Sequence, residues 1–317
     1  MHPQRLMVTY LLLFFPLGPV FSAPAAVARG PWLGQEPPGK TPELFGEGII
    51  STSLDLHSCP VFSPDGRLVL WRVMNSGDAN GVYFMEMVDS AWTPPRKAPF
   101  IETGPGVTND VPWFSLDGET LYFMSDRPVG SSGRKKRIWT VDREAGAWLE
   151  PVALDALNPG DITLHWQFSI SADGVFYLTG MSENGYGAYD IFKAEPDKRE
   201  YAIELMEFPI NSTDSDICPF IAPDESYLIF ASSNRDDGYG QTDLYISFRE
   251  PDGSWGAPMN MGPGINSPSQ DWCPVVSHDG RYLFFTSFRN GSCHAWWVDA
   301  GIIAELRVAH QRNNSSN

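Results

Sequence analysis

Residues 273–280 read Cys-Pro-Val-Val-Ser-His-Asp-Gly, and four earlier stretches of the chain follow the same pattern. The five copies end on Asp65-Gly66, Asp117-Gly118, Asp173-Gly174, Asp224-Glu225 and Asp279-Gly280. The shared aspartates are separated by 52, 56, 51 and 55 residues. A period near 50 residues with strand-like content is typical of a propeller or a similar array.

Each copy continues in the same way. In the fourth, the apolar run Tyr227–Phe230 is followed by the loop 234–240, rich in Gly, Asn and Asp, and then by a second apolar run, Leu244–Ser247. A Trp-x-x-Pro step, Trp255 to Pro258, then leads to a further short strand. Four short antiparallel strands per repeat predict one blade of a β-propeller.

The number of blades follows from how the repeats end. The fifth copy stops after its third strand, at Asp299, while residues 42–51 align without gaps on residues 258–267. We therefore predict an all-β, five-bladed β-propeller over residues 42–299, with the N-terminal strand completing the last blade. Such closure removes the open sheet edges that invite aggregation. A six-bladed ring, the less favoured reading, needs another ~50 residues. Residues 300–317 are expected to form a short helix and a tail.

The N-terminus has the features of a secretory signal peptide. Arg5 precedes the apolar run 6–20, and the small residues Ser22 and Ala23 follow. We assign residues 1–25 to this signal and 26–41 to a leader segment, and expect a periplasmic or extracellular protein. The apolar run is shorter than the ~20 residues of a membrane-spanning helix, so we expect no membrane span.

The net charge of the chain limits the kinds of partner that we expect. The 317 residues include 39 acidic and 22 basic ones, a net charge of −17. An acidic surface repels phosphate backbones, so nucleic acid is not an expected partner. We expect a monomer whose partner is a protein, peptide or glycan of the cell envelope.

The motif also carries a family resemblance. The repeat resembles the PD40, or WD40-like, repeat of TolB-type propellers. Both have an Asp turn, then an apolar strand, then Ser-x-Arg and a Gly-rich loop before Asp-Leu-Tyr. The stretches that carry it best are residues 220–235 and 277–289. The resemblance extends to a group of exported bacterial PD40 proteins without established activity. It implies a periplasmic protein that docks other proteins or peptides, although TolB-type propellers commonly have six blades and an extra N-terminal domain.

Candidate binding residues lie eight and seven positions before the turn aspartates. We expect these positions, on the innermost strands, to ring one mouth of the central channel. The first position holds His57, Asn109, His165, Asp216 and Asp271; the second includes Asp110, Trp166 and Trp272. His and Asp together can bind a metal or exchange protons, can contact a ligand, or can simply fill a solvated channel.

Our hypothesis is a non-enzymatic binding module acting through these residues, without a catalytic residue, a metal site or a cofactor. The alternative is a carbohydrate-active enzyme of the glycoside hydrolase type. That reaction needs paired carboxylates ~5–9 Å apart, and Asp216 and Asp271 on adjacent blades, or Asp110, are the candidates.

Cysteines and long loops leave further alternatives. Cys59, Cys218 and Cys273 precede the proline of their copies, and Cys293 starts the last inner hairpin strand. We expect buried free thiols, although an exported chain can also form disulfides. The loops 182–190 and 233–243 are rich in Tyr and Gly; they serve as hairpin connections or as a second binding surface.

Overall fold

The computed structural model describes residues 27–315, with the exception of 75–76, 102–105 and 130–132. The predicted signal peptide, residues 1–25, lies outside the described residues. Within them, no helix is long and apolar enough to cross a bilayer.

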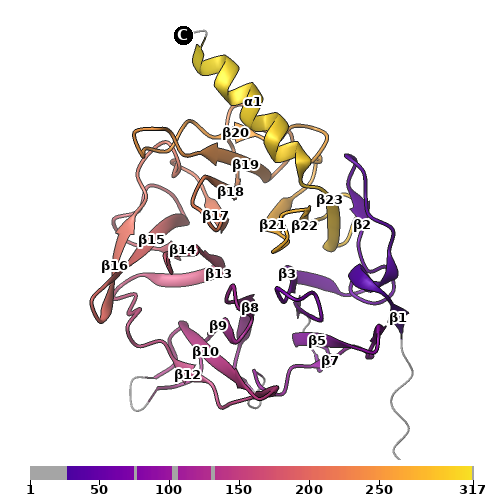
Figure 1. Cartoon of the computed structure of the whole chain (residues 1–317). Coiled ribbons are helices and arrows are strands. Elements are labelled where there is room, and N and C mark those ends of the chain that lie inside the picture. Colours follow the sequence, from indigo (N-terminus) through magenta and orange to yellow (C-terminus); the bar gives the residue numbers. More distant parts are fainter. Residues whose placement is uncertain (1–26, 75–76, 102–105, 130–132, 316–317) are drawn as a thin grey trace, which may run out of the picture.

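Five antiparallel sheets stand around a common axis as the blades of a propeller (Figure 1). The five-bladed, all-β prediction is thus confirmed. Blade 1 contains β3 (Asp55–Phe62), β4 (Leu68–Met74), β5 (Gly81–Val88) and β7 (Arg96–Lys97). Blade 2 contains β8 (Asn109–Phe114), β9 (Thr120–Ser125), β10 (Arg137–Glu144) and β12 (Val152–Ala153). Blade 3 contains β13 (Thr163–Ile170), β14 (Phe176–Met181), β15 (Asp190–Asp197) and β16 (Glu200–Leu205). Blade 4 contains β17 (Asp216–Ile221), β18 (Tyr227–Ser232), β19 (Asp243–Phe248) and β20 (Met259–Asn260).

The last blade is closed by the N-terminal part of the chain, as predicted. Blade 5 contains β21 (Asp271–Val276), β22 (Tyr282–Ser287), β23 (His294–Asp299) and β2 (Glu43–Leu44). Glu43 pairs with Trp297 across the junction. Phe45, which follows β2, is fully buried, with its ring centroid 5.0 Å from those of both Phe284 and Trp297. The two ends of the propeller are therefore joined by a ladder and by an aromatic core.

The leader segment contributes to the same core. β1 (Ala28–Arg29) pairs with β6 (Ala91–Trp92), a short hairpin strand of blade 1 that has a counterpart in β11 (Ala147–Trp148) of blade 2. Trp32, in the short 3-10 segment η1 (Pro31–Gly34), packs edge-on against Phe62 and Tyr282. The segment thus bridges blades 1 and 5.

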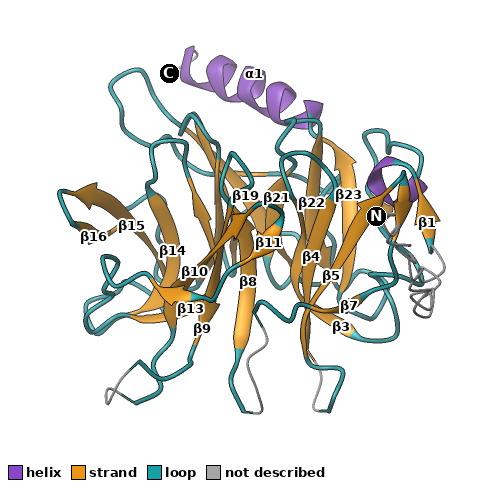
Figure 2. Ribbon diagram, turned by 60° about the horizontal axis from the view of Figure 1, so that its bottom comes forward, coloured by secondary structure: helices purple, strands orange, loops and turns teal. Residues whose placement is uncertain are grey.

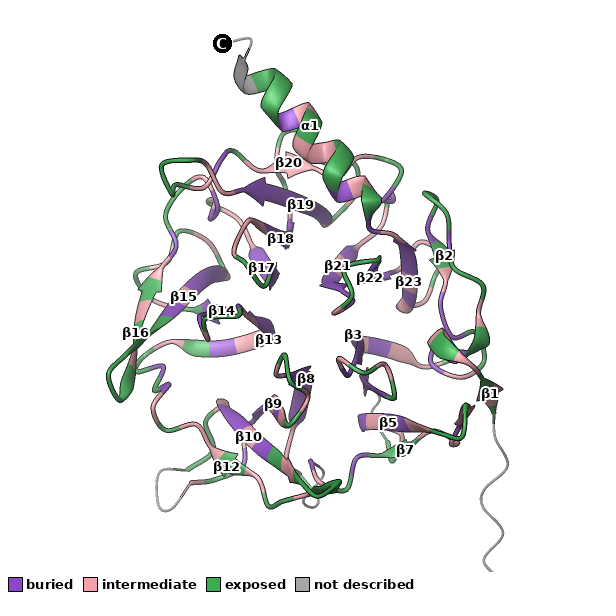
Figure 3. Ribbon diagram, in the orientation of Figure 1, coloured by how far each residue is buried: buried purple, intermediate pink, exposed green. Residues whose placement is uncertain are grey.

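The aspartate turns are held by their own side chains. Ser277 Oγ donates to Asp279 Oδ1 at 2.6 Å, and the same oxygen accepts the backbone N–H of Arg281 at 3.1 Å. Gly280 takes a positive φ of 71°, which glycine adopts without steric cost. Each such turn joins an innermost strand to the second strand of its blade, so all five lie at one end of the channel; Figure 3 shows exposed turns around the centre.

The C-terminal helix α1 (Gly301–Ser315) lies outside the ring of blades (Figures 1 and 2). It is attached to blade 4. The guanidinium of Arg307 stacks on Phe248 at 4.6 Å, and His310 Nε2 lies 2.7 Å from Glu250 Oε1.

Candidate functional site: the channel mouth

Three residues of the predicted ring are buried anchors. Asp216 and Asp271 have no exposed surface, and Asn109 is 2% exposed. Each binds the arginine of the Ser-x-Arg region of its own blade. Arg235 Nη2 donates to Asp216 Oδ1 at 2.8 Å, Arg289 Nη2 to Asp271 Oδ1 at 2.9 Å, and Arg127 Nη2 to Asn109 Oδ1 at 2.9 Å.

The remaining acceptor capacity of these carboxylates holds the chain that enters each blade. Asp216 Oδ2 accepts the backbone N–H of Ser212 at 2.6 Å and its hydroxyl at 2.8 Å, and Asp271 binds Ser267 in the same way. The guanidinium of Arg235 also contacts the stacked rings of Phe230 and Tyr245, 5.3 and 5.2 Å from their centroids. A buried charge with a complete set of partners is a structural element, and Asp216 and Asp271 do not face the solvent of the channel.

The two histidines occupy different positions because the inner strands are bulged. Asn109, Asp216 and Asp271 lie opposite Ser125, Ser232 and Ser287. The same place in the ladder is taken by Leu56, opposite Val73, in blade 1 and by Thr163, opposite Met181, in blade 3. β3 and β13 accommodate more extra residues in their bulges than the other inner strands. Equal spacing from the turn aspartate therefore does not give the equal ring positions we expected.

A group of aromatic side chains lies at the end of the channel where the inner strands begin, which we call the strand-start mouth. Trp166 of blade 3 and Trp272 of blade 5 approach with ring centroids 6.5 Å apart. Tyr189 lies 4.3 Å from Trp166, and Phe288 lies 5.9 Å from Trp272. All four rings are half-buried. Because blades 3 and 5 are not neighbours, these rings form an aromatic platform across the opening.

Trp166 reaches this place through an unusual backbone. Its φ is 42°, and the bulge residues Val111, Cys218 and Cys273 of blades 2, 4 and 5 also have positive φ. A bulge re-aims side chains and is frequent beside functional sites. The alternation of residues along a strand does not predict where such a bulge redirects a side chain. A positive φ at a non-glycine residue cannot be predicted from the sequence pattern either.

A charged group lies beside the platform. His57 Nδ1 donates to Asp110 Oδ1 at 2.8 Å, and Arg72 Nε lies 3.9 Å from the same oxygen. Burial raises the pKa of Asp110, but the charge and hydrogen bond of His57 and the charges of Arg72 and Lys136 outweigh it, so the pKa is lowered overall. Asp110 is an ionised, paired carboxylate, which does not suit the role of a general acid.

His165 completes the mouth as a neutral group. Its ring lies 4.6 Å from that of Trp166. Burial, together with the positive charges of Lys136 and His57, lowers the pKa of His165 to about 4. Its buried Nδ1 has no hydrogen-bond partner. At neutral pH the imidazole is uncharged.

The middle of the channel is filled. Gln167 Nε2 reaches from blade 3 to the carbonyl of Pro274 in blade 5, at 2.7 Å. Below the platform, the four cysteines are buried and free, with Cys218 Sγ 3.3 Å from Cys273 Sγ. These contacts cross the channel between its two ends. No group of three or more metal-ligating side chains occurs in the part of the chain that the structure describes.

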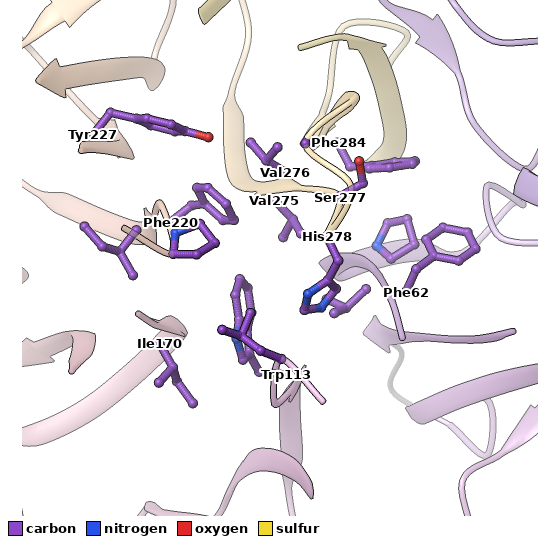
Figure 4. A pocket seen from close by; sticks show the side chains of 16 residues that line it. Phe62, Trp113, Ile170, Phe220, Tyr227, Val275, Val276, Ser277, His278 and Phe284 are labelled. Carbon is purple, nitrogen blue, oxygen red and sulfur yellow. The ribbon is translucent and has the colours of Figure 1, made fainter. Parts of the chain in front are cut away.

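The opposite end contains a hollow that the sequence did not lead us to expect (Figure 4). It measures about 660 Å³ including its opening to solvent, and its walls are mostly apolar. Trp113, Ile170, Phe220 and Val275 come from four different blades. The sequence shows that the inner strands end in apolar residues. It does not show that these residues line one hollow, because that requires the blades to be arranged in a closed ring.

The long loops are hairpin connections held by aspartates. Asp190 Oδ2 accepts the backbone N–H of Tyr186 at 3.1 Å, and Asp243 binds the backbone of Tyr239 in the same way. Tyr186 and Tyr239 are 49% and 54% exposed. These loops follow the second strands of their blades and so lie at the strand-start end. The tyrosines extend the aromatic surface of that face.

The fold and this mouth define a five-bladed β-propeller with an aromatic opening. Neither a scan against protein-family models nor a search of curated proteins finds a match. Among solved structures, the TolB-type protein of Agrobacterium tumefaciens is 18% identical over 78% of each chain, with a TM-score of 0.48. A glycoside hydrolase is 12% identical over 81% of this chain and 96% of its own, with a TM-score of 0.49. The GH43 protein BlXynB of Bacillus licheniformis is 13% identical over 82% and 57%, with a TM-score of 0.47. These likenesses concern the fold alone.

Proposed function

We propose that the protein is a non-enzymatic binding module that takes a protein, peptide or glycan at the strand-start mouth. The observation that carries the proposal is the aromatic platform of Trp166, Tyr189 and Trp272. Half-buried aromatic rings offer a rigid contact surface at low entropic cost, and they stack on peptide groups and on the apolar faces of sugars. His165 and the His57–Asp110 pair add hydrogen-bonding groups at the edge.

The enzymatic alternative has less support from the geometry. A glycoside hydrolase needs one carboxylic acid and one carboxylate facing the substrate. Asp216 and Asp271 are enclosed and bound to arginines, and Asp110 is paired with His57. The N-terminal segment additionally leads us to propose that the protein acts outside the cytoplasm; fractionation of cells of the source organism tests this.

A thermal-shift screen tests the binding proposal. Protein lacking residues 1–25 is mixed with soluble envelope glycans, peptides, divalent metals or a chelator. A ligand at a hundred times its Kd adds ~2.7 kcal/mol to the stability, which raises the Tm measurably. We expect hits that are lost in Trp272→Leu and Trp166→Leu.

The matched control is Trp255→Leu. Trp255 stacks on Arg249 at 4.9 Å and lies on the outer part of blade 4, away from the mouth. A ligand whose effect survives both mouth variants would contradict the proposal. Release of reducing sugar from a glycan would instead favour the hydrolase.

A further inference from the structure

The hollow lies at the turn-side end of the channel, opposite the strand-start mouth. Gln167 and the thiols separate the two ends. Inside the hollow, walls from different blades meet: the rings of Trp113 and Phe220 have centroids 5.9 Å apart. Leu116, which is 48% exposed, lies at the rim of the hollow. Figure 4 shows the imidazole of His278 among the lining side chains. An apolar hollow that stays open to solvent has room for an apolar group from outside.

The residues around the hollow are mainly acidic, and this favours an apolar group that is flanked by positive charges. The five turns, residues 63–67, 115–119, 171–175, 222–226 and 277–281, contain seven acidic and two basic residues. Their five shared aspartates are exposed. In four of these turns, one carboxylate oxygen of the shared aspartate accepts a hydrogen bond from the backbone N–H of the residue two positions later. The negative charge of these groups is thus fixed around the opening.

The polar side chains that line the hollow favour an uncharged group as its occupant. Burial lowers the pKa of His278, so its imidazole is neutral at pH 7. Burial raises the pKa of Tyr227 to about 12, so its phenol is also neutral. Apolar walls with a few convergent neutral polar groups are typical of ligand pockets, whereas a charge would be desolvated there.

We propose that this end of the channel binds an exposed peptide segment of a basic partner protein. One leucine-sized apolar side chain enters the hollow, and lysine or arginine residues on either side of it face the ring of turn aspartates. The charge complementarity of an acidic rim and a basic segment also accelerates the encounter at low salt.

Fluorescence anisotropy with three labelled pentapeptides tests the proposal. The probe Gly-Lys-Leu-Lys-Gly is compared with Gly-Glu-Leu-Glu-Gly and with Gly-Lys-Gly-Lys-Gly. We expect only the first to bind, and its affinity to fall as salt shortens the Debye length below ~10 Å. Equal binding of the first and third peptides would show non-specific attraction to an acidic protein and overturn the proposal, as would binding of none.

Variants locate the site. Leu116→Gln removes the apolar rim and should weaken binding at least ~10-fold. Leu149→Gln is the control, because Leu149 is similarly exposed (46%) but lies on the outer part of blade 2. Asp224→Asn should weaken binding, whereas Asp252→Asn, at an exposed turn on the outside of blade 4, should not. Binding that survives Leu116→Gln and Asp224→Asn would place the peptide elsewhere. Trp272→Leu, which tests the strand-start mouth, should leave it unchanged.

Discussion

The substitution Asp216→Ala distinguishes a structural carboxylate from a functional one. Asp216 is fully buried and accepts four hydrogen bonds, from Ser212 N–H, Ser212 Oγ, Ser232 Oγ and Arg235 Nη2. The variant leaves the Arg235 guanidinium, whose side chain is 15% exposed, without its counter-charge. Removing one partner of a buried ion pair costs ~3–5 kcal/mol. In a domain of this size that corresponds to a Tm lower by ~6–10 °C.

The assay is urea unfolding followed by tryptophan fluorescence, together with a thermal scan. Asp236→Ala is the control, because Asp236 is exposed on a loop of the same blade; its effect should stay within ~0.5 kcal/mol. The double variant Asp216→Ala/Arg235→Met removes both charges. It should be more stable than the sum of the single effects by ~0.5–3 kcal/mol, because no charge is left unpaired.

A loss below ~1 kcal/mol for Asp216→Ala would refute this reasoning, since it would fall within the range of an ordinary substitution. If ligand binding or hydrolysis disappeared at the same time, the carboxylate would be a site residue, as the sequence pattern suggested. A large loss of stability would leave the platform at the strand-start mouth as the candidate site.

Three further predictions concern the closure, the mouth and the thiols. Phe45→Ala should lower the free energy of unfolding by ~3–5 kcal/mol, because a fully buried ring is lost where the propeller closes; urea unfolding measures this, and exposed Val152→Ala should have no effect. His165 should make the protein less stable as the pH falls from ~6.5 towards about 4, because in that range only the unfolded chain takes up the proton; stability against pH should be flatter for His165→Gln. The thiol reagent DTNB should label no cysteine in the native protein and four in denaturant, because all four are buried and free and burial raises the pKa of Cys59. Only two labelled thiols in denaturant would contradict this, because it would mean that two of the four cysteines form a disulfide.

The architecture was accessible from the sequence because it repeats. Five copies of one turn give the blade count, and the match of residues 42–51 to 258–267 gives the closure, which the pairing of Glu43 with Trp297 confirms. A propeller blade contacts mainly its neighbours, so local strand patterns and a few turn residues are sufficient to specify it. The Asp-Gly turns belong to the same local level, because their hydrogen bonds span only a few residues.

The site depended on tertiary structure. His57, His165, Asp216 and Asp271 share one spacing, yet extra bulge residues in β3 and β13 place the histidines apart from the aspartates. The neighbouring strands decide whether an aspartate faces solvent or binds an arginine. The spacing of residues along the chain gives no information about these strands. The platform of Trp166 and Trp272 and the hollow under Trp113 and Phe220 join side chains from blades that are not adjacent. Only closing the ring brings such residues together, because the positions of the blades around the axis fix which side chains meet in the channel.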